Sequence, residues 1–201
     1  TAGKTAWMFK DNISSWTWKG FEGTTANVDV YSSGEEVELF LNDKSLGRKP
    51  AGRENHFTAS YEVPYEPGAL KAVAYQKDRK LGEYELSTAK SVTKLKVCRV
   101  TENERNIAYI KIWLVDDNGI INSQEAEKRL LHASVAGNGV LEGFGTANPS
   151  SEEDYFSDSV TTFDGSALAA VRWKDVKSKE PAVLKVWTDD GCQVRINIEN
   201  N

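Results

Sequence analysis

The sequence has few of the residues that build redox, metal and hydrolytic centres. Its 201 residues include only two cysteines and two histidines. Cys98 and Cys192 are too few for a disulfide-rich scaffold or a four-cysteine zinc site. Two unpaired, buried thiols are favoured, and a bridge between them stays open. His56 lies in an expected turn and His132 follows two leucines, and the chain has no GxSxG, HExxH or CxxC motif. Structural roles are therefore favoured for both histidines, and no catalytic, metal or cofactor site is predicted.

Long apolar runs and an excess of basic charge are also missing. No stretch of about 18 consecutive apolar residues occurs, so no membrane span is predicted. The net charge is −5, which argues against a nucleic-acid partner, because neutralising phosphates requires a basic face. The first ten residues, TAGKTAWMFK, contain no apolar signal core and no initiator methionine. We interpret residues 1–15 as a linker from an upstream region.

Alternating apolar and polar residues dominate the first half of the chain. In EVELFLN (36–42), Val37, Leu39 and Leu41 fall on one face, and the following NDKS predicts a tight turn. Four further segments have the composition of strands: VDVYS (28–32), FTASYEV (57–63), ALKAVAY (69–75) and LGEYELSTA (81–89). In FTASYEV, Phe57 is expected to face inward with the other odd-numbered residues. The spacing of these strands predicts a β-sandwich over residues 16–90.

The pattern restarts after a small, polar segment at residues 89–93, where we place a domain boundary. Later strands are expected at 93–100, 107–117, 139–145, 166–173, 182–188 and 192–199. Residues 124–132 could form a helical turn or lead into a strand, and 146–159 reads as a long polar loop. A second sandwich over residues 93–201 follows. The predicted fold is therefore all-β, with two tandem immunoglobulin-like β-sandwich domains.

Tryptophans are the best candidates for contact residues. Strand parity places Trp113, Trp173 and Trp187 on outward faces, where an indole ring can stack on a sugar or pack against a neighbouring domain. Trp16 and Trp18 lie on either side of Thr17 and are expected to point to the same face of the chain. Core or inter-domain packing is the favoured role for both. For all five tryptophans, packing is favoured over carbohydrate binding.

Carboxylates are plentiful, with 30 aspartates and glutamates. Most of them fall in turns or on exposed strand faces, so a glycosidase-type carboxylate pair is not favoured. The segments DDNG (116–119), SEED (151–154) and DDG (189–191) offer oxygen ligands for calcium but lack the spacing of a calcium loop. Ordinary turn chemistry is the favoured explanation.

Several long segments resemble the C-terminal accessory domains of bacterial β-galactosidases of glycoside hydrolase family 2. In the first half these are SWTWKGFEG, VDVYSSGEEVELFLNDKSLGRK and VPYEPGALKAVAYQKDRKLG. In the second half they are IAYIKIWLVDDNG and GNGVLEGFGTANPSSEEDYFSDSVTTFDGSALAAVR. The resemblance spans roughly residues 16–198. The sequence departs from the family pattern at Asp43 (usually Gly), at Ser15 (commonly His), and at Trp113 and Trp187 (usually polar).

The resemblance implies a non-catalytic C-terminal fragment, because the two catalytic glutamates of the family lie on an upstream barrel. No catalytic residue carries over to this chain. The implied role is structural and inter-domain support, with the barrel of the same chain as partner and an oligomer left open. It implies a bacterial protein of the periplasm or the cytoplasm. Two alternatives stay open: a carbohydrate-binding module that recognises galactosides through outward tryptophans, and a cell-surface stalk or adhesin.

Overall fold

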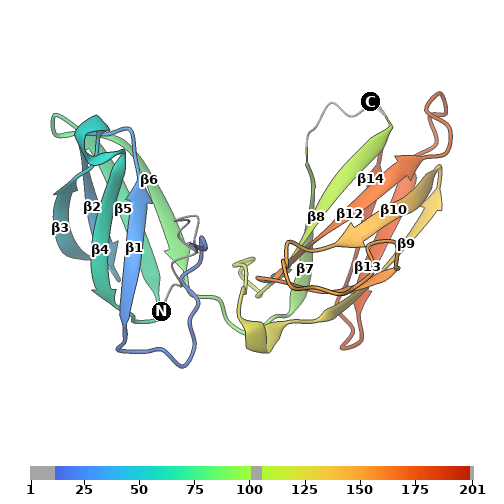
Figure 1. Cartoon of the computed structure of the whole chain (residues 1–201), viewed down its shortest axis with the longest axis horizontal. Coiled ribbons are helices and arrows are strands. Elements are labelled where there is room, and N and C mark those ends of the chain that lie inside the picture. The colour runs from blue at the N-terminus through green and yellow to red at the C-terminus, as the bar shows by residue number, and fades with distance from the viewer. Residues whose placement is uncertain (1–11, 101–105, 200–201) are drawn as a thin grey trace. The chain divides into compact units, whose positions relative to one another are not determined.

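The computed structural model describes residues 12–100 and 106–199, and most of the predicted linker 1–15 lies outside them. The chain divides into two compact units, Thr1–Thr88 and Ala89–Asn201 (Figure 1). The described residues form fourteen strands and two short 3-10 helices. No helix among them is long and apolar enough to cross a membrane. The predicted all-β fold of two tandem immunoglobulin-like sandwiches is confirmed.

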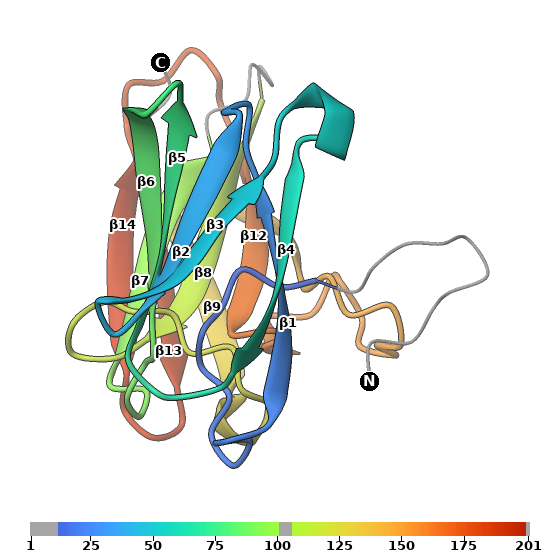
Figure 2. The same ribbon diagram turned by 90° about the vertical axis from the view of Figure 1, so that its left-hand side faces the viewer.

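The first unit packs a two-stranded sheet against a four-stranded one (Figure 2). The smaller sheet pairs β1 (Thr25–Tyr31) with β4 (Thr58–Pro64). The larger sheet has the order β3-β2-β5-β6, with β2 (Glu36–Leu41), β3 (Lys44–Pro50), β5 (Ala69–Gln76) and β6 (Arg79–Ser87). A 3-10 helix, η1 (Arg53–Asn55), precedes β4.

The core of this unit follows the predicted alternation. Val37, Leu39 and Leu41 of β2 are buried, and they face the smaller sheet, where Tyr61 of β4 donates a hydrogen bond from its hydroxyl to the Val37 carbonyl at 2.6 Å. Phe57 is an exception to the predicted inward set, since its side chain is 48% exposed. Its φ of 58° places it in the turn before β4, so the strand alternation does not extend to it.

The turn between β2 and β3 has the geometry of a tight hairpin. Asn42 and Asp43 both lie in the left-handed region, with φ of 49° and 63°. Asn and Asp tolerate that region better than most residues, so both residues fit this tight turn. The Asn42 side chain accepts a hydrogen bond from the Ala69 amide at 2.9 Å and so ties the turn to β5. The stretch is a structural hairpin, as predicted.

The second unit is a sandwich of two four-stranded sheets. One has the order β10-β12-β8-β7, with β7 (Lys94–Val100), β8 (Ile107–Val115), β10 (Gly139–Gly145) and β12 (Ser166–Trp173). The other has the order β11-β9-β13-β14, with β9 (Leu130–Gly137), β11 (Ser159–Thr161), β13 (Ala182–Thr188) and β14 (Gln193–Ile198). The short β11 was not predicted, and the ambiguous segment 124–132 contains both the 3-10 helix η2 (Glu125–Glu127) and the start of β9.

The two cysteines lie near neighbouring strands of this unit and are unpaired. Cys98 on β7 is exposed, whereas Cys192, just before β14, is half-buried. The prediction of unpaired thiols is confirmed, but the prediction that they are buried is wrong for Cys98. Its alternation with Val97 places it on the solvent side of the sheet, opposite Lys111 of β8.

The first residues of the second unit are held by Asp116, which is fully buried at the end of β8. Its carboxylate accepts backbone hydrogen bonds from Lys90, Asn118 and Ile120, each at 2.9 Å. Burial alone would raise the pKa of Asp116, but these three amides outweigh it and hold the pKa below its ordinary value. Asp116 therefore closes a turn and fixes the start of the unit, in agreement with turn chemistry at DDNG.

Candidate functional site

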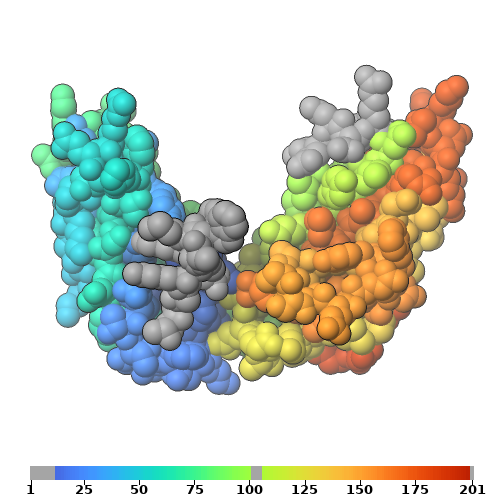
Figure 3. All heavy atoms as spheres, viewed as in Figure 1, coloured from blue at the N-terminus to red at the C-terminus, as the bar shows by residue number. Residues whose placement is uncertain are grey.

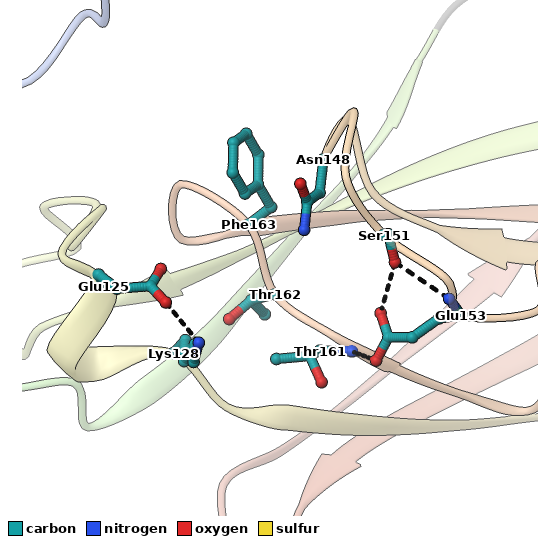
Figure 4. Close-up of a pocket in the computed structure, with 8 residues that line it drawn as sticks. All are labelled: Glu125, Lys128, Asn148, Ser151, Glu153, Thr161, Thr162 and Phe163. Atoms are coloured by element: carbon teal, nitrogen blue, oxygen red, sulfur yellow. Dashed lines mark hydrogen bonds and ion pairs between the residues drawn. The ribbon is translucent and has the colours of Figure 1, made fainter.

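A polar pocket of about 310 Å³ opens at one end of the second unit (Figure 4). It lies between η2, the loop after β10 and the segment after β11, so three segments distant in sequence build it. Figure 4 shows Glu125 and Lys128 at one end, and Ser151 and Glu153 at the other. The remaining lining residues are Asn148, Thr161, Thr162 and Phe163.

Both carboxylates that line the pocket already have ion-pair or hydrogen-bond partners. Glu125 forms an exposed ion pair with Lys128, three residues further along η2 and its C-terminal flank. Glu153 accepts hydrogen bonds from the Thr161 backbone amide at 2.9 Å and from the Ser151 hydroxyl at 3.2 Å. Glu153 therefore ties the long loop to β11, and neither carboxylate is placed as an isolated acid or base.

An ionic cluster supports the wall of the pocket. The Arg129 amide donates a hydrogen bond to the Thr162 hydroxyl, and the Thr162 amide donates one to the Arg129 carbonyl. The Arg129 guanidinium contacts Asp190 at 2.9 Å and Glu127 at 3.1 Å. Hydrogen bonds from Thr188 and then from Arg129 lower the pKa of Asp190. Burial opposes the charged form of Arg129, but Asp190 and Glu127 raise its pKa overall. The cluster stays ionised and fixes the lining of the pocket, including the buried Thr162.

The hydroxyl, amide and charged groups that line this pocket can bind polar groups. Within residues 12–100 and 106–199, no group of three or more His, Cys, Asp or Glu side chains is placed to hold a metal ion. His132 contacts Asp189 at 3.0 Å and stacks on Trp187, on the opposite side of β9 from the core. His56 lies in the turn before β4 with φ of 52°.

The outward tryptophans of the second unit lie on different sheets. Trp113 of β8 pairs with Ser166 of β12 in one sheet, and its ring lies 5.3 Å from the Lys111 ammonium. Trp187 of β13 pairs with His132 of β9 in the other sheet. Both tryptophans are half-buried, and each alternates with buried residues of its strand. The two tryptophans lie on the outer faces of sheets that pack on opposite sides of the core. They therefore do not form one binding platform.

The other three candidate tryptophans serve as packing residues. Trp173 is only 3% exposed and lies in the core of the second unit, so its predicted outward position is wrong. It shares its face of β12 with Val171, and it is Arg172 that points outward to pair with Glu142. Trp16 is buried in the first unit, where its indole donates to the Glu66 carbonyl, and Trp18 packs against the same core.

Sequence reasoning missed a second hollow, of about 450 Å³, on the outer face of the β10-β12-β8-β7 sheet. We call it the glycine hollow; it is lined by Lys111, residues 143–147, Tyr155, residues 166–168 and Ala170. The signal was present in the sequence. Gly143 and Gly145 occupy alternate positions of one strand, which leaves one side of that strand bare.

The fold and these surfaces define a module of two tandem β-sandwiches. Residues 95–191 match the family model described as glycoside hydrolase family 2 C-terminal domain 5. Residues 23–82 match the model described as domain of unknown function (DUF4982). These matches, together with the relatives described below, support a C-terminal accessory fragment of glycoside hydrolase family 2.

Longer glycosidases contain similar regions. Beta-galactosidase BoGH2A of Bacteroides ovatus is 27% identical over 146 residues, which cover 71% of this chain and 17% of that protein. A solved family 2 glycosyl hydrolase from Bacteroides cellulosilyticus is 34% identical with a TM-score of 0.82, over 94% of this chain and 26% of that one. A β-glycosidase structure from Bacteroides vulgatus is 26% identical with a TM-score of 0.81, over 93% of this chain and 24% of that one. The chain therefore spans about a quarter or less of these relatives.

Proposed function

We propose that the chain is the non-catalytic C-terminal part of a β-galactosidase-like glycoside hydrolase, and that it gives structural support to a catalytic domain elsewhere in the same protein. The observation that carries this proposal is the match to accessory domains within much longer glycosidases, one of them named a beta-galactosidase. The engaged state of Glu125 and Glu153 is consistent with it, since neither side chain is poised for acid or base chemistry.

Exposed aromatic side chains support a packing role. Phe156 is 85% exposed on the long loop after β10, which lies on the surface of the second unit (Figure 3). In the first unit Tyr31 and Phe21 are also largely exposed. Exposed apolar side chains that gather into a contiguous patch are typical of surfaces that contact another protein body.

The test uses the full-length glycosidase from which the chain derives, cut into two polypeptides. The 201-residue chain is added to the remainder of the enzyme, and the melting temperature of the remainder is measured against chain concentration. We expect a saturable rise in melting temperature, because a partner that binds only the folded state stabilises it by mass action. No hydrolysis of a chromogenic galactoside is expected from the chain alone. Turnover by the isolated chain, or a melting temperature that does not respond to it, would contradict the proposal.

A further inference from the structure

The glycine hollow has an apolar floor because two strand positions lack side chains. Gly143 and Gly145 of β10 pair with Ala170 and Leu168 of β12, so the outer face of β10 has no side chains at these two positions, and the neighbouring β12 contributes a methyl group and a leucine side chain. Phe144, between the two glycines, is buried and faces the core. The hollow of about 450 Å³ lies within the range of about 300–1,000 Å³ that is typical of small-molecule sites.

Tyr155 forms an aromatic wall that depends on this bare floor. The Tyr155 carbonyl accepts a hydrogen bond from the Phe144 amide at 2.7 Å, which fixes the loop against β10. Its ring rests on Gly145 so closely that a Cβ added to Gly145 would lie 2.2 Å from the ring. More than half of Tyr155 remains exposed, so the ring is available to a ligand.

Four of the residues that line the hollow have polar side-chain groups: the Lys111 ammonium and the hydroxyls of Thr146, Tyr155 and Ser166. Lys111 is exposed and makes no ion pair with any described carboxylate, and its ammonium lies 5.3 Å from the centre of the Trp113 ring. The Ser166 hydroxyl donates to the Phe163 carbonyl at 3.2 Å and retains its acceptor capacity.

We propose that the glycine hollow binds a pyranose ring. A sugar presents apolar C–H groups, which suit the floor and the Tyr155 ring, and hydroxyls around its edge, which suit Lys111 and Ser166. An aliphatic side chain from a partner protein would fill the floor but would make no use of those polar groups, whereas the hydroxyls of a sugar can form hydrogen bonds with them. This activity goes beyond the support role and does not depend on it.

A Cβ added at Gly143 would enter the hollow without a close contact. Gly143 has no left-handed φ, and a Cβ added there would meet the Tyr155 carbonyl oxygen at 3.6 Å and the Ala170 Cβ at 4.0 Å, both ordinary contacts. Gly143→Val therefore places methyl groups on the floor of the hollow. Tyr155→Ala instead removes the aromatic wall of the hollow. It leaves the hydrogen bond between the Phe144 amide and the carbonyl of residue 155 in place. Phe156→Ala is the matched control, because Phe156 neighbours Tyr155, is more exposed and does not line the hollow.

The experiment is an NMR titration of the intact 201-residue chain with methyl β-galactopyranoside and, separately, with methyl β-glucuronopyranoside. We expect at least one sugar to bind with a dissociation constant on the order of millimolar. Its largest shift changes should fall on the amides of residues 143–147 and 166–168. Gly143→Val and Tyr155→Ala should each weaken binding by about tenfold or more, and Phe156→Ala should leave it unchanged.

Three results would overturn the proposal. One is the absence of shifts with both sugars at concentrations about tenfold above the millimolar range, which would assign the hollow to an apolar side chain of a partner protein instead. Another is binding that persists in folded Gly143→Val and Tyr155→Ala. The third is a set of shifts confined to the polar pocket of Figure 4 or to the Trp187 face.

Discussion

Asp116 is the residue whose loss should most damage the second unit without touching the apolar core. Asp116→Ala removes an acceptor from the backbone amides of Lys90, Asn118 and Ile120 at a position with no solvent exposure. A hydrogen bond to a charged group contributes about 1.5–3 kcal/mol, and the turn amides regain part of that loss from water. We expect a destabilisation of about 3–5 kcal/mol, large for a single substitution outside the core.

The effect should also depend on pH in a defined direction. The pKa of Asp116 is lowered in the folded state from its ordinary value of 3.8. A carboxylate with a lowered pKa contributes stability that is present above the unfolded pKa and is lost as the pH falls through the folded pKa. The difference between the wild type and Asp116→Asn, which keeps one acceptor oxygen, should therefore be constant near neutral pH and shrink below about pH 4.

The assay is urea denaturation followed by amide resonances in each unit. Ile112 in β8 reports on the second unit, and Leu39 in β2 reports on the first and serves as an internal reference. A loss of stability below about 1 kcal/mol for Asp116→Ala would refute the proposed role of its hydrogen bonds. A difference between wild type and Asp116→Asn that grows as the pH falls would refute the sign of the pKa shift.

Two further predictions concern the first unit. Leu39→Ala should cost about 2–5 kcal/mol, because the side chain is 1% exposed in a closed core, whereas Leu81→Ala, at 51% exposure, should change stability by less than about 0.5 kcal/mol in the same denaturation experiment. Gly68→Ala should destabilise more than Gly47→Ala by thermal melting. Both glycines have positive φ, but only at Gly68 would a Cβ overlap the Asn42 side chain, at 1.8 Å, and equal melting temperatures would show that Asn42 moves aside freely.

The sandwich architecture was predictable because strand alternation has a period of two residues and the turns carry strong local signals. Val37, Leu39 and Leu41 fell on the buried face as the pattern requires, and Asn42-Asp43 formed the predicted tight turn. Alternation places residues on opposite faces but does not say which face is the core. Trp173 was assigned to the outward face for that reason. Ala169 and Val171, which lie on the same face of β12 as Trp173, are buried and show that this face is the core face.

The candidate sites were less predictable, because each is built from segments that only the fold brings together. The polar pocket joins Glu125, Glu153 and Phe163 from three separate segments, and no local pattern links them. Phe57 was placed on the wrong face because its positive φ interrupts the strand alternation. An apolar residue type gives no sequence signal for a positive φ. The spacing of Gly143 and Gly145 did carry a local signal for the glycine hollow. Its meaning depends on Tyr155, which comes from a loop without periodicity.

The most direct test of the proposed support role removes this segment from the longer glycoside hydrolase that we propose contains it. The measurement is the rate of thermal inactivation of the enzyme with and without the segment, together with the turnover number of the folded fraction at lower temperature. Our account predicts faster inactivation of the truncated enzyme with a turnover number close to that of the intact one. Equal inactivation rates, or a truncated enzyme that is folded and heat-stable but unable to turn over substrate, would contradict it.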